Sequence, residues 1–109
     1  MLASLLGSVN KERVLVYLAA RGRGYAREIA RSYDAPLYPV QKAMEKLEEA
    51  GVLVSRSVGT TREYEFNPRY PARTELASLL DRAISLYLAA LRDKLLLTRS
   101  RPRRKGKPL

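Results

Sequence analysis

The sequence predicts a mostly α-helical protein of the α+β class with one small β-hairpin. Apolar residues recur at helical spacing in four segments of the chain, which indicates four helices. Two short strand-like runs flank a turn at residues 59–61, which indicates a hairpin. A chain of 109 residues, 46% of them hydrophobic, has the size and composition of one folded domain with one additional element.

The first predicted helix spans about residues 11–20, with Asn10 as its N-cap. Val14, Leu15 and Leu18 fall on one face, as in a helix that buries one side. The glycines within residues 21–24 are expected to end this helix, because glycine readily adopts the left-handed conformation found at helix ends.

The second predicted helix is short, at about residues 26–33. Ile29, Ala30 and Tyr33 share its expected buried side, and Arg27 and Arg31 share the opposite side. This helix therefore presents two arginines to solvent or to a partner.

The third predicted helix spans about residues 37–50 and stops at Gly51. Pro36 and Pro39 fit at its start, because the first backbone N–H groups of a helix have no partner within the helix. Its apolar positions have the spacing of one buried helix face: Val40, Ala43, Met44 and Leu47.

The hairpin strands are expected at residues 52–58 and 62–66. Tyr64 and Phe66 alternate with glutamates, the pattern of a half-buried strand, so both aromatic rings are expected in the core. A long helix is expected from about residue 75 to 97, capped by Thr74. At 1.5 Å per residue it spans on the order of 35 Å, which exceeds what a domain this small can cover.

The charge balance favours a polyanionic partner. Lys and Arg number 21 against 11 Asp and Glu, for a net charge of +10. Nucleic acid is the commonest such partner, although acidic lipid surfaces or ribosomal RNA would also explain the charge. Residues 99–109 contain six of the basic residues and no acidic one. The rest of the chain has 15 basic and 11 acidic residues, a net charge of +4. This tail is expected to be disordered, and it is either a nonspecific DNA clamp or a segment without a role.

The residue types exclude several classes of function. The chain has no cysteine and no histidine, so disulfides, thiolate zinc sites, cysteine nucleophiles and histidine acid–base chemistry are not available to it. It also lacks a phosphate-binding loop and paired acids in a predicted cleft, so we expect no enzyme, no metal and no cofactor. The apolar stretch at residues 83–97 is interrupted by three charged residues, so no membrane span is expected. We expect the protein to be cytoplasmic.

The order helix, helix, tight turn, helix, hairpin is that of a winged helix-turn-helix. Residues 25–31 and 40–53, with the run Leu-Glu-Glu-Ala-Gly at 47–51, closely resemble the ArsR-like winged-helix regulators of bacteria and archaea. The resemblance covers about residues 8–70 and includes the wing, where a basic turn precedes an aromatic strand. The long helix is similar to the dimerisation helix of that family.

Two departures from the family pattern limit what the resemblance implies. The family usually has glycine in the turn and Ser or Thr at the start of the recognition helix, whereas this chain has Asp34-Ala35-Pro36 and Tyr38-Pro39 there. The approach to DNA is therefore expected to differ in detail. The metal-sensing cysteines and histidines of the namesake subgroup are absent, so a metal-sensor role does not transfer.

The resemblance implies a transcriptional regulator with three segments: a winged helix-turn-helix at 1–73, a dimerisation helix at 74–98 and the basic tail at 99–109. The helix at 37–50 would read the major groove, and the wing at 55–63 would lie on the backbone or in the minor groove. Gln41 can pair with an adenine edge, and Lys42 can reach guanine or phosphate. Glu45 faces the same way but is expected to be solvated. The candidate DNA contacts are Arg27, Tyr38, Gln41, Lys42, Arg56, Thr60 and Arg62.

Other interpretations remain open from sequence alone. Each candidate contact can also be an ordinary solvated side chain. The apolar residues of the long helix are too many to pack on one small domain, which favours a homodimer, with Leu2, Leu5 and Leu6 as further interface residues. A winged helix can also be a protein-interaction module or a nonspecific architectural DNA-binding protein.

Overall fold

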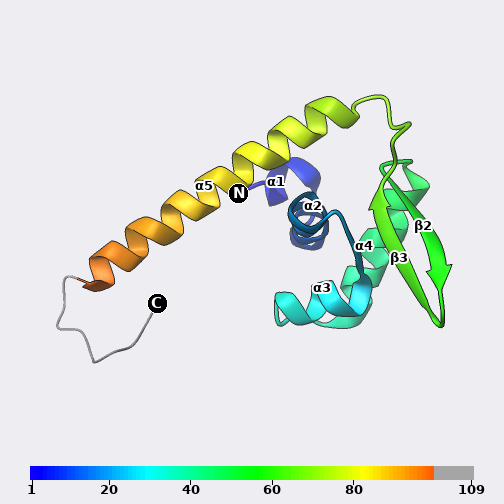
Figure 1. The fold of residues 1–109 in the computed structure, drawn as a ribbon, viewed down its shortest axis with the longest axis horizontal. Helices are drawn as coiled ribbons and strands as arrows, with labels where there is room; N and C mark the ends of the chain where they lie inside the picture. Colours follow the sequence, from blue (N-terminus) through cyan, green and yellow to red (C-terminus); the bar gives the residue numbers. More distant parts are fainter. Residues whose placement is uncertain (100–109) are drawn as a thin grey trace.

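A computed structural model describes the backbone of residues 1–99 and the side chains of residues 1–90. Figure 1 shows α5 as a long rod that leaves the hairpin end and passes over α1 and α2. The described elements, in chain order, are α1 (Ala3–Leu6), α2 (Val9–Arg21), β1 (Arg23–Tyr25), α3 (Ala26–Ser32), α4 (Leu37–Glu49), β2 (Leu53–Val58), β3 (Thr61–Phe66) and α5 (Arg73–Arg99).

Helix α2 begins two residues earlier than predicted, and its cap is Ser8. The Ser8 hydroxyl accepts a hydrogen bond from the Lys11 N–H at 3.1 Å, which satisfies one of the free donors of the first turn. The prediction of Asn10 as the cap was wrong, because Asn10 lies inside the helix and accepts instead from Arg13 at 3.1 Å. Helix α1, just before it, was not predicted.

Strand β1 was also missed, and it converts the predicted hairpin into a three-stranded antiparallel sheet of order β1-β3-β2. Gly24 lies opposite Tyr64 and against the ring of Tyr17, so close that an added Cβ would stand 2.9 Å from Tyr17 Cε1. Glycine at this position thus lets β1 pass beside α2.

The turn between α3 and α4 uses Asp34 where the resembling family usually has glycine. Asp34 has φ 51, in the left-handed region, which Asp tolerates better than most residues. The Ala35 N–H then bonds to the Ala30 carbonyl at 2.8 Å and closes the end of α3. Helix α4 begins directly after Pro36 and carries Pro39 in its first turn, as predicted.

The β2–β3 hairpin closes through Gly59 and Thr60, with Val58 paired to Thr61. Thr61 therefore belongs to β3 and not to the turn. Tyr64 is buried as predicted, and Phe66 is half-buried against the core.

The core lies where α2, α3, α4, the sheet and α5 meet. Every apolar position predicted for α4 is buried in it, and Leu80 and Ala83 of α5 join it. Leu2 is 6% exposed and packs in this core, so its assignment to a partner interface was wrong. The buried residues are Leu2, Val14, Leu15, Tyr17, Leu18, Ile29, Ala30, Val40, Ala43, Met44, Leu47, Val52, Leu53, Tyr64, Leu80 and Ala83.

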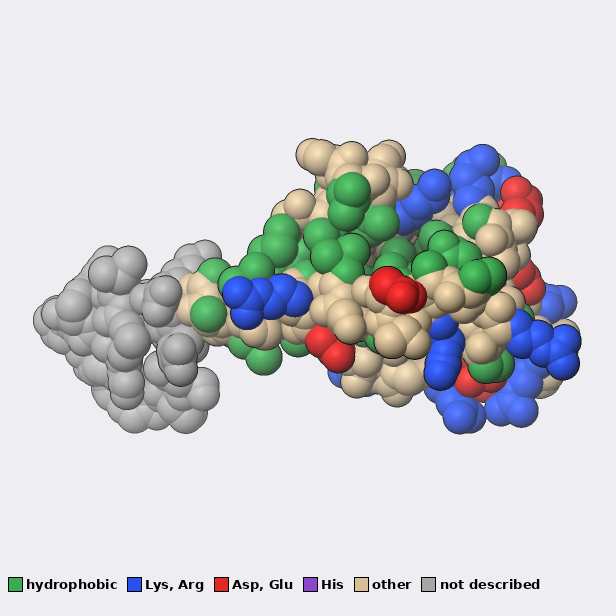
Figure 2. All heavy atoms as spheres, turned by 90° about the horizontal axis from the view of Figure 1, so that it is seen from above, with side chains coloured by type: hydrophobic (Ala, Val, Ile, Leu, Met, Phe, Trp, Pro, Cys, Tyr) green, Lys and Arg blue, Asp and Glu red, His purple; other side chains and the backbone are tan. Residues whose placement is uncertain are grey.

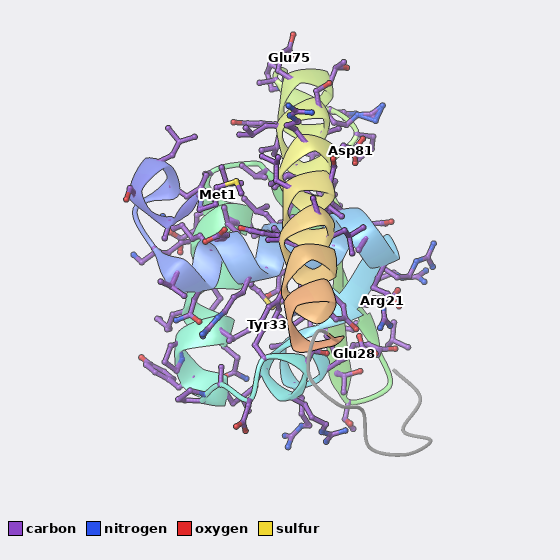
Figure 3. All side chains as sticks on the ribbon, turned by 90° about the vertical axis from the view of Figure 1, so that its left-hand side faces the viewer. Met1, Arg21, Glu28, Tyr33, Glu75 and Asp81 are labelled. Carbon is purple, nitrogen blue, oxygen red and sulfur yellow. The ribbon has the colours of Figure 1, made fainter. Side chains whose placement is uncertain are left out.

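Helix α5 begins at Arg73, so Thr74 lies in its first turn. The prediction that Thr74 caps this helix was wrong. In Figure 3, α5 crosses in front of α2. The Tyr87 hydroxyl donates to the Glu12 carboxylate at this crossing, which ties α5 to α2. None of the helices in the described residues is both long and apolar enough to cross a membrane.

Part of the apolar surface along α5 stays uncovered in the single chain. Figure 2 shows hydrophobic side chains gathered along this helix on one face. Leu88 is 61% exposed and Leu86 40%, and Leu5 and Val9 of the neighbouring segments are also exposed. The side chains of residues 91–99 lie outside the described residues. The tail predicted to be disordered at 99–109 lies outside them as well, except for the backbone of Arg99, which belongs to α5 and not to the tail.

Candidate nucleic-acid interface

A hollow of about 320 Å³ lies between the starts of α3 and α4 and the tip of the hairpin. We call it the α4–wing groove. Four predicted contact residues line it, from three separate parts of the chain: Arg27, Gln41, Thr60 and Arg62. The rest of its lining is Tyr25, Ala26, Leu37, Glu45, Thr61 and Tyr64.

The pairing of β1 with β3 places α3 beside the hairpin. Tyr25 pairs with Glu63, and α3 begins at the next residue, so Arg27 in its first turn lies close to the wing. The Tyr25 N–H donates to Glu28 Oε1 at 3.3 Å, which closes the first turn of α3. Figure 3 shows Glu28 at the same end of the molecule as Tyr33, below the crossing of α2 and α5.

Tyr38 and Lys42 lie on the exposed face of α4, beside the groove and not among its lining residues. Tyr38 is 67% exposed, and Lys42 Nζ sits 5.7 Å from the centre of its ring, a cation–π distance. Lys42 Nζ also lies 3.2 Å from Glu45 Oε1, and this hydrogen bond raises the pKa of Lys42. Lys42 therefore carries its positive charge at neutral pH, with one carboxylate beside it. Glu45 is exposed, in line with the expectation that it is solvated.

The two wing arginines lie on opposite faces of the hairpin. Side chains alternate along a strand, so Arg62 shares a face with the buried Tyr64, which is the face turned toward the helices. Arg56 pairs with Glu63 on the other face and donates hydrogen bonds of 3.0 and 2.9 Å to Glu63 Oε1. The groove thus contains Arg62 but not Arg56.

Two side chains that sequence reasoning did not single out connect Arg62 to α4. Arg62 Nη1 donates to Ser55 Oγ at 3.0 Å, and Ser55 Oγ donates to Glu48 Oε2 at 2.7 Å. These residues are seven positions apart in each step, and only the strand register brings them together. Tyr25 was likewise missed as a lining residue, because β1 was not predicted.

The electrostatics of this surface suit an anionic partner. Arg27 and Arg62 reach the groove from two sides, and Arg31 lies exposed one helical turn beyond Arg27. None of these three arginines takes part in an ion pair within the described residues. Gln41 adds a side chain that both donates and accepts hydrogen bonds. Arginine guanidinium groups with free N–H donors bind phosphate well, so the groove can accept a phosphate backbone.

No protein-family model and no curated protein sequence matches this chain. Solved structures share its fold. A mutant of ZitR from Lactococcus lactis superimposes with a TM-score of 0.64 over 87% of this chain and 62% of that one, at 14% identity. The adhesin competence repressor AdcR from Streptococcus pyogenes gives a TM-score of 0.55 over 79% and 66%, at 18% identity.

A transcriptional regulator homologue from Pyrococcus horikoshii OT3 gives a TM-score of 0.57 over 82% of this chain and 89% of that one, at 15% identity. The chain spans 62% and 66% of the lengths of the first two of these structures, less than two thirds of each. At these identities the likeness concerns the fold, which is a winged helix-turn-helix as predicted.

Proposed function

We propose that this protein is a DNA-binding transcriptional regulator that inserts α4 into the major groove. The observation that carries the proposal is the convergence of Arg27, Gln41, Thr60 and Arg62 on the α4–wing groove. The hairpin would then lie along the sugar-phosphate backbone or in the minor groove. The proposed activity requires no catalytic group, metal or cofactor, and it would take place in the cytoplasm.

The exposed face of α4 has the chemistry that base reading needs. The major groove is about 12 Å wide and admits one helix. Gln41 can form two hydrogen bonds with an adenine edge, and Lys42 can reach guanine or phosphate. Arg27 and Arg62, on either side, would neutralise backbone phosphates and fix the position of α4 along the duplex. Tyr38 at the start of α4 can stack on a sugar.

Two similarities support the proposal. The AdcR and Pyrococcus horikoshii structures, whose fold this chain shares, are described as a repressor and a transcriptional regulator homologue. The resemblance of residues 25–31 and 40–53 to ArsR-like regulators points the same way, and membership of that family is part of the proposal.

We also propose that two copies of the chain associate through α5. Leu88 lies exposed on this helix, and Leu5 and Val9 add exposed apolar surface. Contiguous apolar surface of this kind is uncommon on soluble monomers. A two-fold dimer would cover it and present two α4 helices to successive turns of the same face of DNA.

Sedimentation or light scattering of the full chain and of two variants tests the dimer. We expect the full chain to be dimeric and Leu88→Glu to be monomeric, since a carboxylate would be buried in the interface. Ser78→Glu adds the same charge at another exposed position of α5 and should leave the dimer intact. A monomeric full chain would refute this part of the proposal.

Fluorescence anisotropy of labelled duplex DNA over a salt series tests DNA binding. It compares the DNA upstream of the protein's own gene with a shuffled duplex of the same composition. We expect preference for the upstream duplex and loss of that preference in the double variant Gln41→Ala, Lys42→Ala. Lys46→Ala is the control for loss of one positive charge from α4, because Lys46 is exposed on this helix and is not among the predicted DNA contacts.

The other outcomes identify the other candidate functions. Equal binding to both duplexes, with a salt dependence that weakens when the chain ends at residue 98, would indicate a nonspecific architectural protein that uses its tail. A complete lack of binding at moderate salt would refute the DNA proposal and leave a protein-interaction module.

A further inference from the structure

We infer that Ser55 and Glu48 are positioning residues that hold the guanidinium of Arg62 at the α4–wing groove. This inference rests on the proposed function, and it describes how the wing orients Arg62 for contact with DNA. Neither residue belongs to the predicted set of DNA contacts.

The three side chains form one hydrogen-bonded chain across three elements. Arg62 on β3 donates to Ser55 on β2 at 3.0 Å, and Ser55 donates to Glu48 on α4 at 2.7 Å. Ser55 pairs with Tyr64, whose buried ring holds the strands in register. The hydroxyl is therefore a fixed point between the wing and the helix proposed to read the bases.

A hydroxyl is well suited to this place because it accepts one hydrogen bond while donating another. Ser55 accepts from the guanidinium and donates to the carboxylate, so both of its partners are oriented. Within the described residues no ion pair joins Arg62 directly to Glu48. The positive charge is thus oriented without being neutralised at contact distance.

The remaining donors of Arg62 stay available for a ligand. A guanidinium has five N–H groups, and the described hydrogen bonds of Arg62 use one nitrogen, Nη1. Arg56 contrasts with it, since two of its nitrogens donate to Glu63. Of the two wing arginines, Arg62 is the one held in place with its charge still open to phosphate.

Such an arrangement lowers the cost of binding. A long side chain that is already ordered loses less conformational entropy when it meets its ligand. Removal of the Ser55 hydroxyl would leave Arg62 present and charged but no longer held. We therefore expect lower affinity for the duplex, because Arg62 would contact DNA in a smaller fraction of the complexes.

A double-mutant cycle on duplex binding tests this role. We expect Ser55→Ala to weaken binding about two- to tenfold, the range of one lost hydrogen bond, and Ser55→Thr to restore it. Ser78→Ala is the control for loss of a hydroxyl, because Ser78 lies exposed on α5, outside both the wing and the lining of the groove. In an Arg62→Gln background, Ser55→Ala should cost nothing more. Glu48→Ala should show the same coupling to Arg62, on top of the gain in affinity for any duplex that removal of a carboxylate brings.

A second measurement reads the position of Arg62 without DNA. Side-chain NMR relaxation of the Arg62 Nε–H group in the free protein should report an ordered guanidinium, which becomes mobile in Ser55→Ala and stays ordered in Ser78→Ala. Thermal unfolding of each variant separates this local effect from loss of the fold.

The outcomes distinguish failure of this inference from failure of the proposed function. If Ser55→Ala weakens duplex binding by the same factor in the wild-type and Arg62→Gln backgrounds, the positioning role is overturned and the proposed function is not. A wild-type guanidinium as mobile as that of the exposed Arg69 would overturn it even if DNA binds. A wild-type protein that binds no duplex, with Arg62 ordered, would overturn the proposed function and with it any role of this chain of hydrogen bonds in DNA binding.

Discussion

Arg56 and Glu63 stand directly opposite each other on β2 and β3, and the Arg56 guanidinium donates two hydrogen bonds, 3.0 and 2.9 Å long, to Glu63 Oε1. The Arg56 side chain is 63% exposed, so the pair contributes about 1 kcal/mol or less to stability. It matters more for function, because the charge of Arg56 is met by a carboxylate on the face of the hairpin turned away from the groove. The two wing arginines are therefore not equivalent.

Replacement of the two wing arginines should show this difference. We expect Arg62→Gln to weaken duplex binding by about tenfold or more, because a charged hydrogen bond to phosphate is lost. It should also reduce the slope of log affinity against log salt by about 0.9, the value for one phosphate contact. Arg56→Gln should cost less. Fluorescence anisotropy over a salt series measures both, and an equal loss in the two variants would contradict the assignment of faces.

Glu45 should oppose DNA binding, since its carboxylate lines the groove and pairs with Lys42. Glu45→Gln removes a charge that repels phosphate and frees Lys42, so we expect affinity for any duplex to rise about two- to fivefold. Glu49→Gln, exposed on the same helix but outside the groove, is the control and should change affinity less. A fall in affinity confined to duplexes with one particular cytosine would show instead that Glu45 accepts a hydrogen bond from that base.

Gly24→Ala should destabilise the fold. The added Cβ would stand 2.9 Å from Tyr17 Cε1 and 3.1 Å from Glu28 Oε1, and the Tyr17 side chain is buried and cannot easily move. Overpacking of this kind costs about 1–3 kcal/mol in the free energy of unfolding, which urea denaturation measures. In a Tyr17→Leu background the cost of Gly24→Ala should shrink. The close packing of β1 on α2 would be contradicted if Gly24→Ala unfolds at the same urea concentration as the wild type.

Stability should respond to alkaline pH and not to neutral pH. The chain has no histidine, so stability should be nearly constant between about pH 6 and 9. Burial, above all, raises the pKa of Tyr17, Tyr33 and Tyr64 above the ordinary value of 10.0. The unfolded chain then loses these protons first, so the stability linked to them is fully present below pH 10.0 and is lost as the pH rises through the folded-state values.

Thermal unfolding at a series of pH values, together with tyrosinate absorbance, checks this dependence. The melting temperature should fall as tyrosinate appears. A fall of the melting temperature between about pH 6 and 8 would mean that some other group controls stability, since no side chain here has an ordinary pKa in that range.

The sequence by itself determined every described helix except α1, and much of the core. The apolar spacing of α4 placed Val40, Ala43, Met44 and Leu47 on one face, and all four are buried. Such spacing is reliable because a helix that packs on one side must repeat its apolar residues with the helical period. Pro36 and Gly51 bounded α4 for equally local reasons, since one cannot continue a preceding helix and the other readily adopts a positive φ.

The errors lie where local preference does not decide. Asn10 and Ser8 are both good N-caps, and the choice of Ser8 depended on the chain being extended at that residue. Strand β1 has three residues, too few to show a period, and it exists because β3 offers it a partner. Leu2 was wrongly predicted at an interface because no pattern in the sequence shows that α1 folds back on α2.

The tertiary structure alone decided which charged groups share a surface. Arg56 and Arg62 have the same side chain and lie on one predicted hairpin, yet the register of β2 on β3 places them on opposite faces, one beside Glu63 and one beside Ser55. A shift of one residue in that register would exchange the two faces, because side chains alternate along a strand. The register depends on the packing of Tyr64 and Leu53 against helices far away in the chain, and for that reason no local pattern in the sequence could predict the α4–wing groove.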